Sequence, residues 1–478
     1  MMLYQKLIED NLDWPYPILT DTHRTCTYAQ LHQKVLELSG QLQRHGGRRG
    51  QRAVIINGNT LETVFAILAC IWSGLCFIIV PRDADEAHIR YVCSDAQPAL
   101  LLDTRMNSEV EIKATGLESD GEELVYILYT SGSSGVPKGV MAPEAQVLFC
   151  MDAINDRLGN GPEDAILCCL PLSFDYGLYQ LFFAFRFRSR LVLQSGDVPQ
   201  QIPQLLVKEH ITAFPAMPAL LAMLLRTGLM QRVAPLLRLR YVSSTGDDFP
   251  PTLIRQLKAL LPQTEIIPMY GQTECKRISI MPFGHLDKVL TGSCGLPLRG
   301  TAVWLDKPDE TGVGELIVSG PHVMAGYLHT DADSSAYFFQ HPQRGRCLRT
   351  GDLFRIDDEG YLYFYARKRR ILKIHGRRIG NVELERKLEA HTAGTFRQLR
   401  VIGCPEPLTG ESILICVSTD ENQGTVEAQL RAAVAEWPRY QRPVRAYISA
   451  QPFPRSANGK VDDALLLKEA IRNGTAAL

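Results

Sequence analysis

Short β-branched and apolar runs alternate with helical patterns through about the first 300 residues of the chain. This alternation is typical of parallel sheets covered by helices. Between the first two runs, Asn59 and Glu62 have the spacing of a capping box, and Gly74 supplies a helix stop, which together predict a β-α-β unit. The runs are RAVIIN (52–57), CFIIV (76–80), ELVYILYT (123–130), AILCCL (165–170), RYVSS (240–244) and EIIPMY (265–270).

After about residue 300 the pattern changes to the glycine-rich, hairpin-like segments GVGELIVSG and DDEGYLYFYARK, followed by the basic run ARKRRILKIHGRR (366–378). Next come a helical stretch at 382–391, the strand candidates RQLRVIGC and ESILICVST, and a last helix before PRSANGK. A chain of 478 residues is too long for one ordinary core. We therefore predict an α/β fold with a large N-terminal domain of parallel sheets covered by helices (1–366), a hinge (367–371) and a small α+β C-terminal domain (372–478).

Composition excludes several classes of protein. The 51 Lys and Arg against 52 Asp and Glu provide no general attraction to nucleic acid or to an anionic membrane. The 12 cysteines form no CxxC pair and indicate reduced thiols. The N-terminus lacks the basic start and apolar run of a signal peptide, and the longest apolar stretch, near 64–72, is too short to span a bilayer. We expect a cytoplasmic protein that binds neither nucleic acid nor membrane.

The stretch LYTSGSSGVPKGV (128–140) joins a strand to a loop of small hydroxyl residues and glycines. Backbone N–H groups and hydroxyls in such a loop converge on phosphate oxygens, and Lys138 adds a point charge. In the mononucleotide P-loop, however, Ser or Thr follows the lysine at a helix start, whereas here Pro137 precedes it and Gly139 follows. The stretch alone leaves two alternatives open, a phosphate loop of another kind and a flexible surface loop.

Six segments, in order, resemble the motifs of the adenylate-forming superfamily, which includes acyl-CoA synthetases, luciferases and the adenylation domains of nonribosomal peptide synthesis. They extend over essentially the whole chain, which makes chance agreement implausible. The resemblance implies ATP-dependent activation of a carboxylic acid as acyl-AMP, with Mg²⁺, release of pyrophosphate, and transfer of the acyl group to a thiol. The segments are TSGSSGVPKG (130–139), MYGQTE (269–274), GELIVSGPHVMAGYL (314–328), TGD (350–352), RKRRILKIHGRRI (367–379) and RSANGK (455–460).

The resemblance also implies a role for each motif residue at the nucleotide. Taken singly, each has an ordinary alternative as a packing aromatic, a turn residue or a solvated charge; the order of the motifs favours the functional roles. Lys460 would lie between the attacking carboxylate and the α-phosphate, Thr273 would contact the α-phosphate, and Glu274 would bind Mg²⁺. The β- and γ-phosphates would be held by Thr130, Ser131, Ser133, Ser134 and Lys138, and adenine by Tyr270, Gly271, Thr245, Gly246 and Asp247. Asp352 would accept the ribose hydroxyls, and Arg367 would reach the ribose or the phosphate.

A further implication is that the C-terminal domain rotates about the hinge, so that Lys460 leaves and a thiol channel opens. The family usually has Asp, and sometimes Lys, where this chain has Arg369, and Ala366 replaces the usual glycine before Arg367. These departures leave the electrostatic details of the rotation open. The RKRR cluster is alternatively a docking surface for an acidic carrier protein.

The segment LPLSFDYGLYQLFFAF (170–185) bears on the acid. In amino-acid adenylation domains the corresponding segment reads FD, and its Asp binds the substrate ammonium; Asp175 matches that position. A buried ammonium requires an opposite charge, whereas a lone buried Asp is costly beside an apolar chain. The alternative is that Asp175 only caps the following helix. The same alignment implies a pocket lined by Tyr176, Tyr179, Ser243, Thr245, Met269, Arg277 and Ile278.

Arg277 suggests an acidic or hydrogen-bonding group on the far end of the acid, unless its side chain points outward. Because 18 residues follow Lys460, we expect a freestanding enzyme that loads a separate phosphopantetheinyl carrier protein, or else CoA. Three hypotheses follow: an amino-acid ligase acting on a carrier protein, an acyl- or aryl-CoA ligase in which Asp175 is structural, and an inactive adenylate-binding homologue.

Overall fold

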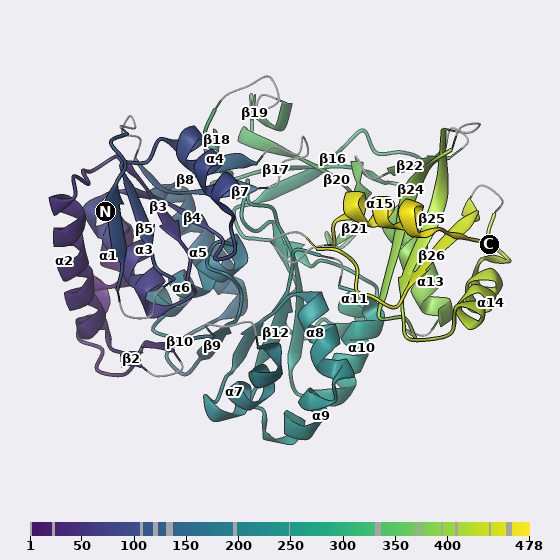
Figure 1. Cartoon of the computed structure of the whole chain (residues 1–478), viewed down its shortest axis with the longest axis horizontal. Helices are drawn as coiled ribbons and strands as arrows, with labels where there is room; N and C mark the ends of the chain where they lie inside the picture. The colour runs from purple at the N-terminus through teal and green to yellow at the C-terminus, as the bar shows by residue number, and fades with distance from the viewer. Residues whose placement is uncertain are drawn as a thin grey trace.

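The chain extends from a cluster of N-terminal helices and strands at one end to a separate C-terminal group at the other (Figure 1). The computed structural model describes residues 2–21, 24–105, 109–117, 123–130, 137–194, 198–247, 249–329, 336–368, 371–374, 377–392, 395–406, 410–438, 441–455 and 461–478. No helix within these ranges is long and apolar enough to cross a membrane.

Two large sheets organise the N-terminal part of the described chain, as the alternating pattern predicts. All six predicted strands are present, and the central strands of both sheets run parallel. The first sheet has the order β18 (Gly326–Tyr327), β8 (Lys138–Pro143), β7 (Leu124–Thr130), β4 (Cys76–Val80), β3 (Arg52–Ile56), β5 (Leu100–Asp103) and β6 (Glu111–Ala114). The second has the order β15 (Leu296–Pro297), β14 (Ser279–Ile280), β13 (Glu265–Tyr270), β12 (Tyr241–Ser244), β11 (Ala213–Pro215), β9 (Ala165–Cys168), β10 (Arg190–Leu193), β1 (Leu19–Thr20) and β2 (Thr25–Cys26).

Helices cover these sheets. Helix α5 packs on β7 and β8, α6 packs on β9 and β10, and the two helices contact each other, so they lie between the sheets. The apolar side chains of both sheets and of these helices form one continuous core. The helices of this part are α1 (Met2–Leu7), α2 (Tyr28–Arg44), α3 (Leu61–Ser73), α4 (Glu86–Ala96), α5 (Glu144–Leu158), α6 (Asp175–Phe187), α7 (Ile202–Lys208), α8 (Pro218–Arg226), α9 (Leu229–Val233), α10 (Pro251–Leu260) and α11 (Leu286–Leu290).

The predicted β-α-β unit is formed by β3, α3 and β4, and Gly74 ends the helix in the left-handed conformation, as expected. The predicted cap is wrong. Thr60 caps α3, and its side chain accepts a hydrogen bond from the Thr63 N–H. Glu62 instead forms an ion pair with Arg24 at 2.7 Å. A hydroxyl one residue later satisfies the helix N–H equally well, and Glu62 is drawn to a guanidinium from a distant segment.

An antiparallel sheet follows in the chain, where the hairpin-like segments predict it. Across β20 and β21, the register pairs Asp352 directly with Arg367. The strand order is β16 (Ala302–Asp306), β17 (Gly314–Ser319), β20 (Gly345–Ile356) and β19 (Phe338–His341), with β21 (Leu362–Arg367) also paired to β20.

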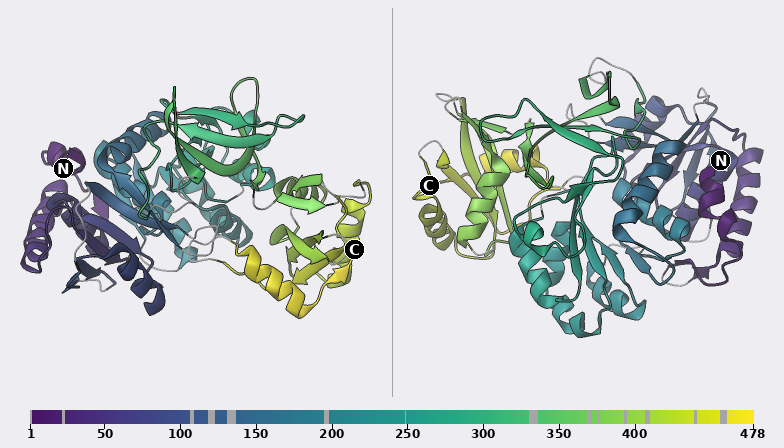
Figure 2. Two further views of the ribbon diagram at one scale, coloured as in Figure 1. Left: turned by 90° about the horizontal axis from the view of Figure 1, so that it is seen from above. Right: turned by 180° about the vertical axis from the view of Figure 1, so that it is seen from behind.

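The C-terminal part has its own apolar cores on the two faces of a four-stranded sheet. The predicted helix and both predicted strands are confirmed as α13, β24 and β25, but a helix after PRSANGK, α15, was not predicted. The elements are β22 (Ile371–Ile374), β23 (Arg377–Gly380), α13 (Asn381–Thr392), β24 (Gln398–Glu406), β25 (Gly410–Ser418), α14 (Gln423–Val434), β26 (Arg445–Ser449), α15 (Asp463–Asn473) and β27 (Ala476–Ala477). This group lies beside the end of the second large sheet (Figure 2).

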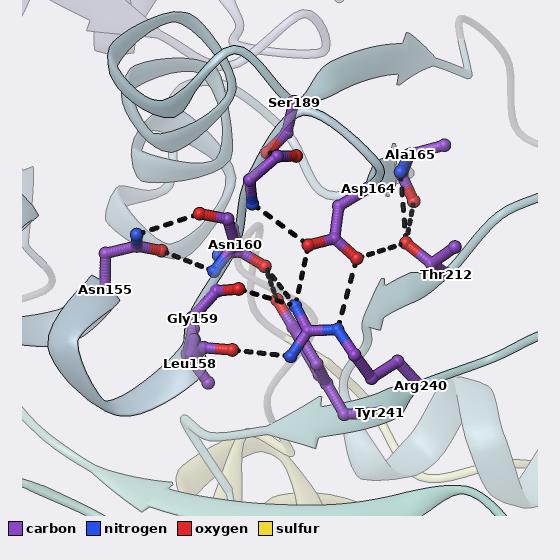
Figure 3. A network of polar contacts seen from close by, with 11 residues as sticks. Asn155, Leu158, Gly159, Asn160, Asp164, Ala165, Ser189, Thr212, Arg240 and Tyr241 are labelled. Atoms are coloured by element: carbon purple, nitrogen blue, oxygen red, sulfur yellow. Dashed lines mark hydrogen bonds and ion pairs between the residues drawn. The ribbon is translucent and has the colours of Figure 1, made fainter.

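A polar network fixes the start of β12 (Figure 3). The Arg240 guanidinium donates to both carboxylate oxygens of Asp164, at 3.2 and 2.8 Å, and to the Leu158 carbonyl at 2.7 Å. Tyr241 donates to Asn160 at 2.9 Å. The network ties the C-terminal end of α5 to β12. It therefore fixes the N-terminal end of β12. The carboxyl end of β12 leads into the candidate site, and sites at the carboxyl ends of strands are usual in α/β proteins.

Candidate functional site

A cavity lies between the N-terminal and C-terminal parts of the chain. It collects residues from the carboxyl ends of β12 and β13, from β20 and β21, and from the C-terminal group. Those that the sequence predicts at the nucleotide or acid are Thr245, Gly246, Asp247, Met269, Tyr270, Gly271, Asp352 and Arg367. The C-terminal group contributes Asn381, Val382, Arg386, Arg400 and Val461.

Asp352 lies at the centre of a polar cluster in this cavity and is only 2% exposed. One carboxylate oxygen accepts hydrogen bonds from the Tyr270 hydroxyl at 2.7 Å and from the Gln272 amide at 2.9 Å. The other lies 3.4 Å from Arg367 Nε. Burial and the nearby carboxylate raise the pKa of Tyr270 well above its usual value, so its hydroxyl stays a donor. The second oxygen thus faces a cationic side chain and retains capacity to accept.

The strands β7 and β8 form an antiparallel hairpin around the predicted phosphate loop. Thr130 and Lys138 pair across its base, so the loop returns into a strand rather than into a helix. This agrees with the predicted difference from a mononucleotide P-loop. Ser131, Ser133 and Ser134 lie outside the described residues.

Tyr327 connects the hairpin to the MYGQTE segment. Its hydroxyl donates to a Glu274 carboxylate oxygen at 2.8 Å, and Lys138 Nζ lies 5.2 Å from the centre of its ring. Burial raises the pKa of Glu274. The strand pairing of β18 with β8 places Tyr327 there. No site residue was predicted within GELIVSGPHVMAGYL (314–328), although Tyr327 near its end makes this contact. Thr273 precedes Glu274 in the same loop, half-buried.

Asp175 is the first residue of α6, and its carboxylate points away from a capping position. The N-cap residue is Phe174, which makes no side-chain capping hydrogen bond. The Asp175 carboxylate lies 3.2 Å from Lys276 Nζ, which also donates to the Asp175 carbonyl at 2.6 Å. The helix-capping alternative is therefore wrong, and the buried ion pair with Lys276 was not predicted.

Lys276 is 1% exposed and has a positive φ of 58°. Its ammonium lies 4.1 Å from the centre of the Tyr179 ring. Burial lowers its pKa to about 8, a change that the Asp175 carboxylate opposes. A glycine is required at 271 because a Cβ there would lie 2.1 Å from the Lys276 carbonyl oxygen. Left-handed backbone at a buried, long side chain is typical of functional sites.

The remaining predicted acid-pocket residues lie around this pair. Tyr176 bonds Ser243 at 2.8 Å, and Tyr179 bonds Tyr126 at 3.2 Å. The Arg277 guanidinium donates to the Thr245 hydroxyl at 2.8 Å and is 4% exposed, so an outward orientation of Arg277 is wrong. Ile278 is fully buried in the core.

Two further predicted residues, Lys460 and Arg369, lie outside the described ranges. Val461, the next residue after Lys460, lines the cavity and pairs with Arg455. The two parts of the chain also meet through charge, since Arg400 on β24 lies 3.7 Å from Asp247 in the loop after β12. No group of three or more His, Cys, Asp or Glu residues suited to a metal occurs in the part of the chain that the structure describes.

The fold and the cavity define a nucleotide-binding α/β enzyme, and sequence comparison identifies the family. Residues 13–119 and 108–328 match the AMP-binding enzymes, and the chain belongs to that family. It is 25% identical to the L-proline--[L-prolyl-carrier protein] ligase of Pseudomonas fluorescens, over 98% of this chain and 99% of that one. Other relatives are larger synthases, of which the chain spans 40% of one and 8% of another.

Solved structures agree with the fold. ATP-bound MatB from Rhodopseudomonas palustris superimposes with a TM-score of 0.86 at 20% identity, covering 98% of both chains. VinN in complex with L-aspartate is 30% identical, with a TM-score of 0.65, and the match covers 76% of this chain and 97% of VinN.

Proposed function

We propose that the protein joins a carboxylic acid, in the first instance an amino acid, to the α-phosphate of ATP, releases pyrophosphate, and passes the acyl group to a thiol. The observation that carries this proposal is the convergence of the motif residues on one cavity between the two parts of the chain. Phosphoryl-type chemistry of this kind needs positioning and charge stabilisation rather than a protein nucleophile.

At the nucleotide, the roles follow from the contacts. Asp352 would accept the ribose hydroxyls through the oxygen that faces Arg367, since its other oxygen is already held by Tyr270 and Gln272. Lys138, at the base of the hairpin, would neutralise the leaving pyrophosphate together with Thr130 and with Ser131, Ser133 and Ser134. Thr273 would contact the α-phosphate, and Tyr270, Gly271, Gly246 and the backbone of Thr245 and Asp247 would enclose adenine.

Magnesium fits one carboxylate of this site. Mg²⁺ is commonly held by one or two carboxylates together with substrate phosphates. Glu274 offers one such carboxylate, oriented by Tyr327 and near Lys138. When bound, the ion would neutralise phosphate charge.

The C-terminal part would act as a mobile domain. We propose boundaries of 1–366 for the adenylation core, 367–371 for the hinge, which includes Arg369, and 372–478 for the domain that carries Lys460. Two separate sets of apolar cores support this division. The ion pair between Arg400 and Asp247 is a contact that such a rotation would break and remake.

An amino acid is favoured because Asp175 lies buried beside the predicted pocket residues, where its carboxylate would bind an ammonium. Tyr176, Tyr179, Ser243, Met269, Arg277 and Ile278 would surround it. The relatives support this choice, since VinN was solved with L-aspartate and the ligase from Pseudomonas fluorescens acts on L-proline. That ligase also supports a phosphopantetheinyl carrier protein, acting in trans, as the acceptor.

A second candidate function is an acyl- or aryl-CoA ligase for an acid without an ammonium. Lys276 favours it, because this side chain already neutralises Asp175 at 3.2 Å. In that case Asp175 and Lys276 would form a structural pair, and CoA would be the acceptor.

Exchange of labelled pyrophosphate into ATP, measured over amino acids and plain carboxylic acids, separates the two. Exchange with amino acids that Asp175→Ala abolishes supports the amino-acid ligase. Exchange with plain acids alone contradicts the amino-acid ligase. If no acid supports exchange, the hypothesis of an inactive adenylate-binding homologue is favoured instead. Glu substitutions of Arg369 and Arg370 that slow thiol transfer without altering exchange would support carrier docking at the RKRR cluster.

A further inference from the structure

The acid pocket contains more positive than negative charge. Three charged side chains meet at the first turn of α6: Asp175, Lys276 and Arg277 are 8%, 1% and 4% exposed. The Lys276 ammonium pairs with the one carboxylate of the three, that of Asp175, at 3.2 Å. One cation therefore remains without a counter-charge from the described residues, in surroundings that water reaches poorly. A buried charge of this kind is costly unless it binds something.

Arg277 is that cation. Its guanidinium donates to the Thr245 hydroxyl at 2.8 Å and lies 5.3 Å from the centre of the Tyr176 ring. Its Nε is buried and has no hydrogen-bond partner among the described residues. Within the described chain, the contacts of the guanidinium are thus to neutral groups. Arg presents several donors in a planar fork that matches a carboxylate, so a guanidinium with a free donor is suited to an anionic ligand.

The backbone directs both cations to the same helix. Consecutive side chains of an extended segment point to opposite faces, but Lys276 and Arg277 both contact α6, at Asp175 and Tyr179 and at Tyr176 respectively. The left-handed conformation of Lys276 and the close approach of its carbonyl to Gly271 accompany this arrangement. The loop thus maintains a costly conformation that presents two cations side by side.

The pocket adjoins the nucleotide cavity. Thr245, which holds Arg277, lines that cavity together with Met269, Tyr270 and Asp352. An acid whose reacting carboxylate faces the α-phosphate would therefore direct its far end toward Arg277 and Lys276.

We propose that the acid carries a second anionic group, a carboxylate, in addition to the one that is activated, and that Arg277 and Lys276 bind this second group. The inference rests on the proposed function and specifies its substrate class. Without ligand the pocket holds two cations and one carboxylate. A monocarboxylic amino acid adds an ammonium and increases the excess of positive charge, whereas a second carboxylate offsets it. When Lys276 binds the second carboxylate, Asp175 is released to bind an ammonium, so an acidic amino acid satisfies all three side chains.

The test uses pairs of acids that differ only in charge at the far end. Pyrophosphate exchange is measured for the full chain with aspartate against asparagine, glutamate against glutamine, and succinate against succinamate. We expect the carboxylate member of at least one pair to be used about 10²-fold better than its amide, because a site built to pair a charged group rejects the analogue that leaves its own groups unpaired. The third pair shows whether the ammonium is needed.

Variants at Arg277 separate binding from a structural role. Arg277→Met should remove the preference within the pair, and Arg277→Lys should restore part of it because it keeps the charge. Both variants should still fold, since Arg277 makes no ion pair with a described residue that would be left buried. ATP binding, measured for each variant, separates an effect through the Thr245 contact from loss of the acid preference. The matched control is Arg299→Met, which removes a cation that is 89% exposed. This variant should prefer the carboxylate over the amide as strongly as the unchanged protein does.

The two proposals fail in different ways. If the amides or monocarboxylic acids are used as well as the dicarboxylic acids, the second anionic group is overturned while the proposed ligase activity stands. The same conclusion follows if Arg277→Met retains the full preference. If no acid supports exchange although ATP binds, the proposed function fails and this inference fails with it.

Discussion

Arg400 of the C-terminal group lies 3.7 Å from Asp247, which follows β12 at the rim of the nucleotide cavity. The same guanidinium contacts Asp463 at 3.2 Å and Glu385 at 3.8 Å, so it is anchored in its own part of the chain. It therefore presents a fixed positive charge to the opposite wall. This contact belongs to the arrangement in which Val461 lines the cavity.

Asp247→Asn tests whether this ion pair favours adenylate formation. The change leaves Arg400 its two other carboxylates, so the C-terminal fold should be unaffected. Pyrophosphate exchange should fall by about 3- to 10-fold, because an ion pair of this exposure contributes about 1 kcal/mol. Thiol transfer from the preformed acyl-adenylate should change less. An equal loss of rate in both half-reactions, or no loss in either, contradicts the view that the Arg400–Asp247 ion pair favours adenylate formation.

The pH dependence of acid selection should follow Lys276. Its pKa is about 8, lowered by burial from 10.5, so the folded protein loses this proton above about pH 8. The charged and titratable groups that face it are Asp175 and Tyr179 from α6, Cys150 from α5 and the adjoining Arg277. Burial raises the pKa of Cys150 to about 12 and that of Tyr179 well above its usual value, so neither loses a proton in the same range.

Preference for the dicarboxylic over the amide substrate should consequently decline from about pH 7 to about pH 9.5. The unfolded chain holds the Lys276 proton up to higher pH than the folded chain does. The contribution of Lys276 to stability must therefore rise with pH between about 8 and 10.5. A decline in preference combined with a loss of stability in that range would show general unfolding instead. Lys276→Met should remove the pH dependence; its persistence in that variant rules out Lys276 as its source.

Gly271→Ala should disrupt the loop that carries Thr273, Glu274 and Lys276. The new Cβ would lie 2.1 Å from the Lys276 carbonyl oxygen, which is backbone and must shift. Exchange should fall by about 10²-fold, since displacement of positioned groups by about 1 Å has that effect. Gly161→Ala is the matched control, because a Cβ there meets nothing within 4 Å. Similar activities for the two variants would show that the loop does not position the site.

Arg240→Met should destabilise the N-terminal part by about 2–4 kcal/mol, because it leaves Asp164 buried without its guanidinium. Asp164 is 8% exposed, and of the bonds that its carboxylate makes to described residues it would keep those to the Thr212 hydroxyl and to the Gly161 N–H. Urea unfolding followed by tryptophan fluorescence measures the change. Lys34→Met breaks a solvent-exposed pair with Glu37 and should leave the free energy of unfolding nearly unchanged. Equal effects would show that the network of Figure 3 adds little.

The six predicted strands of the large sheets are confirmed because each is a β-branched or apolar run, whereas short strands such as β10 and β11 were not predicted. The family resemblance assigns both Asp352 and Arg367 to the nucleotide, and the structure pairs them directly across one hairpin. Helix α15 was missed although Asp462 caps it and apolar residues recur along it at helical spacing. The cap of α3 was misplaced because Asn59 and Thr60 are both suitable caps and only tertiary contacts decide between them.

The Asp175–Lys276 pair could not be predicted from the pattern. Lysine is rarely buried, and the segment CKR gives no periodic signal that it enters the protein. Its burial depends on a left-handed backbone and on a carboxylate 101 residues away in the chain. Tyr327 was likewise missed as part of the site, because its contact with Glu274 depends on pairing of β18 with β8, strands that are remote in sequence.

The most direct test of the proposed chemistry follows oxygen from acid to nucleotide. The accepted acid is labelled with ¹⁸O in its carboxylates and incubated with ATP, Mg²⁺ and a phosphopantetheine thiol, and the AMP is analysed by mass spectrometry. Attack of the carboxylate on the α-phosphate predicts one ¹⁸O in each AMP formed. Lys460→Ala should slow this labelling by about 10²- to 10³-fold, as expected for loss of one positioned charge. Unlabelled AMP, or label in phosphate or pyrophosphate, would contradict the formation of an acyl-adenylate.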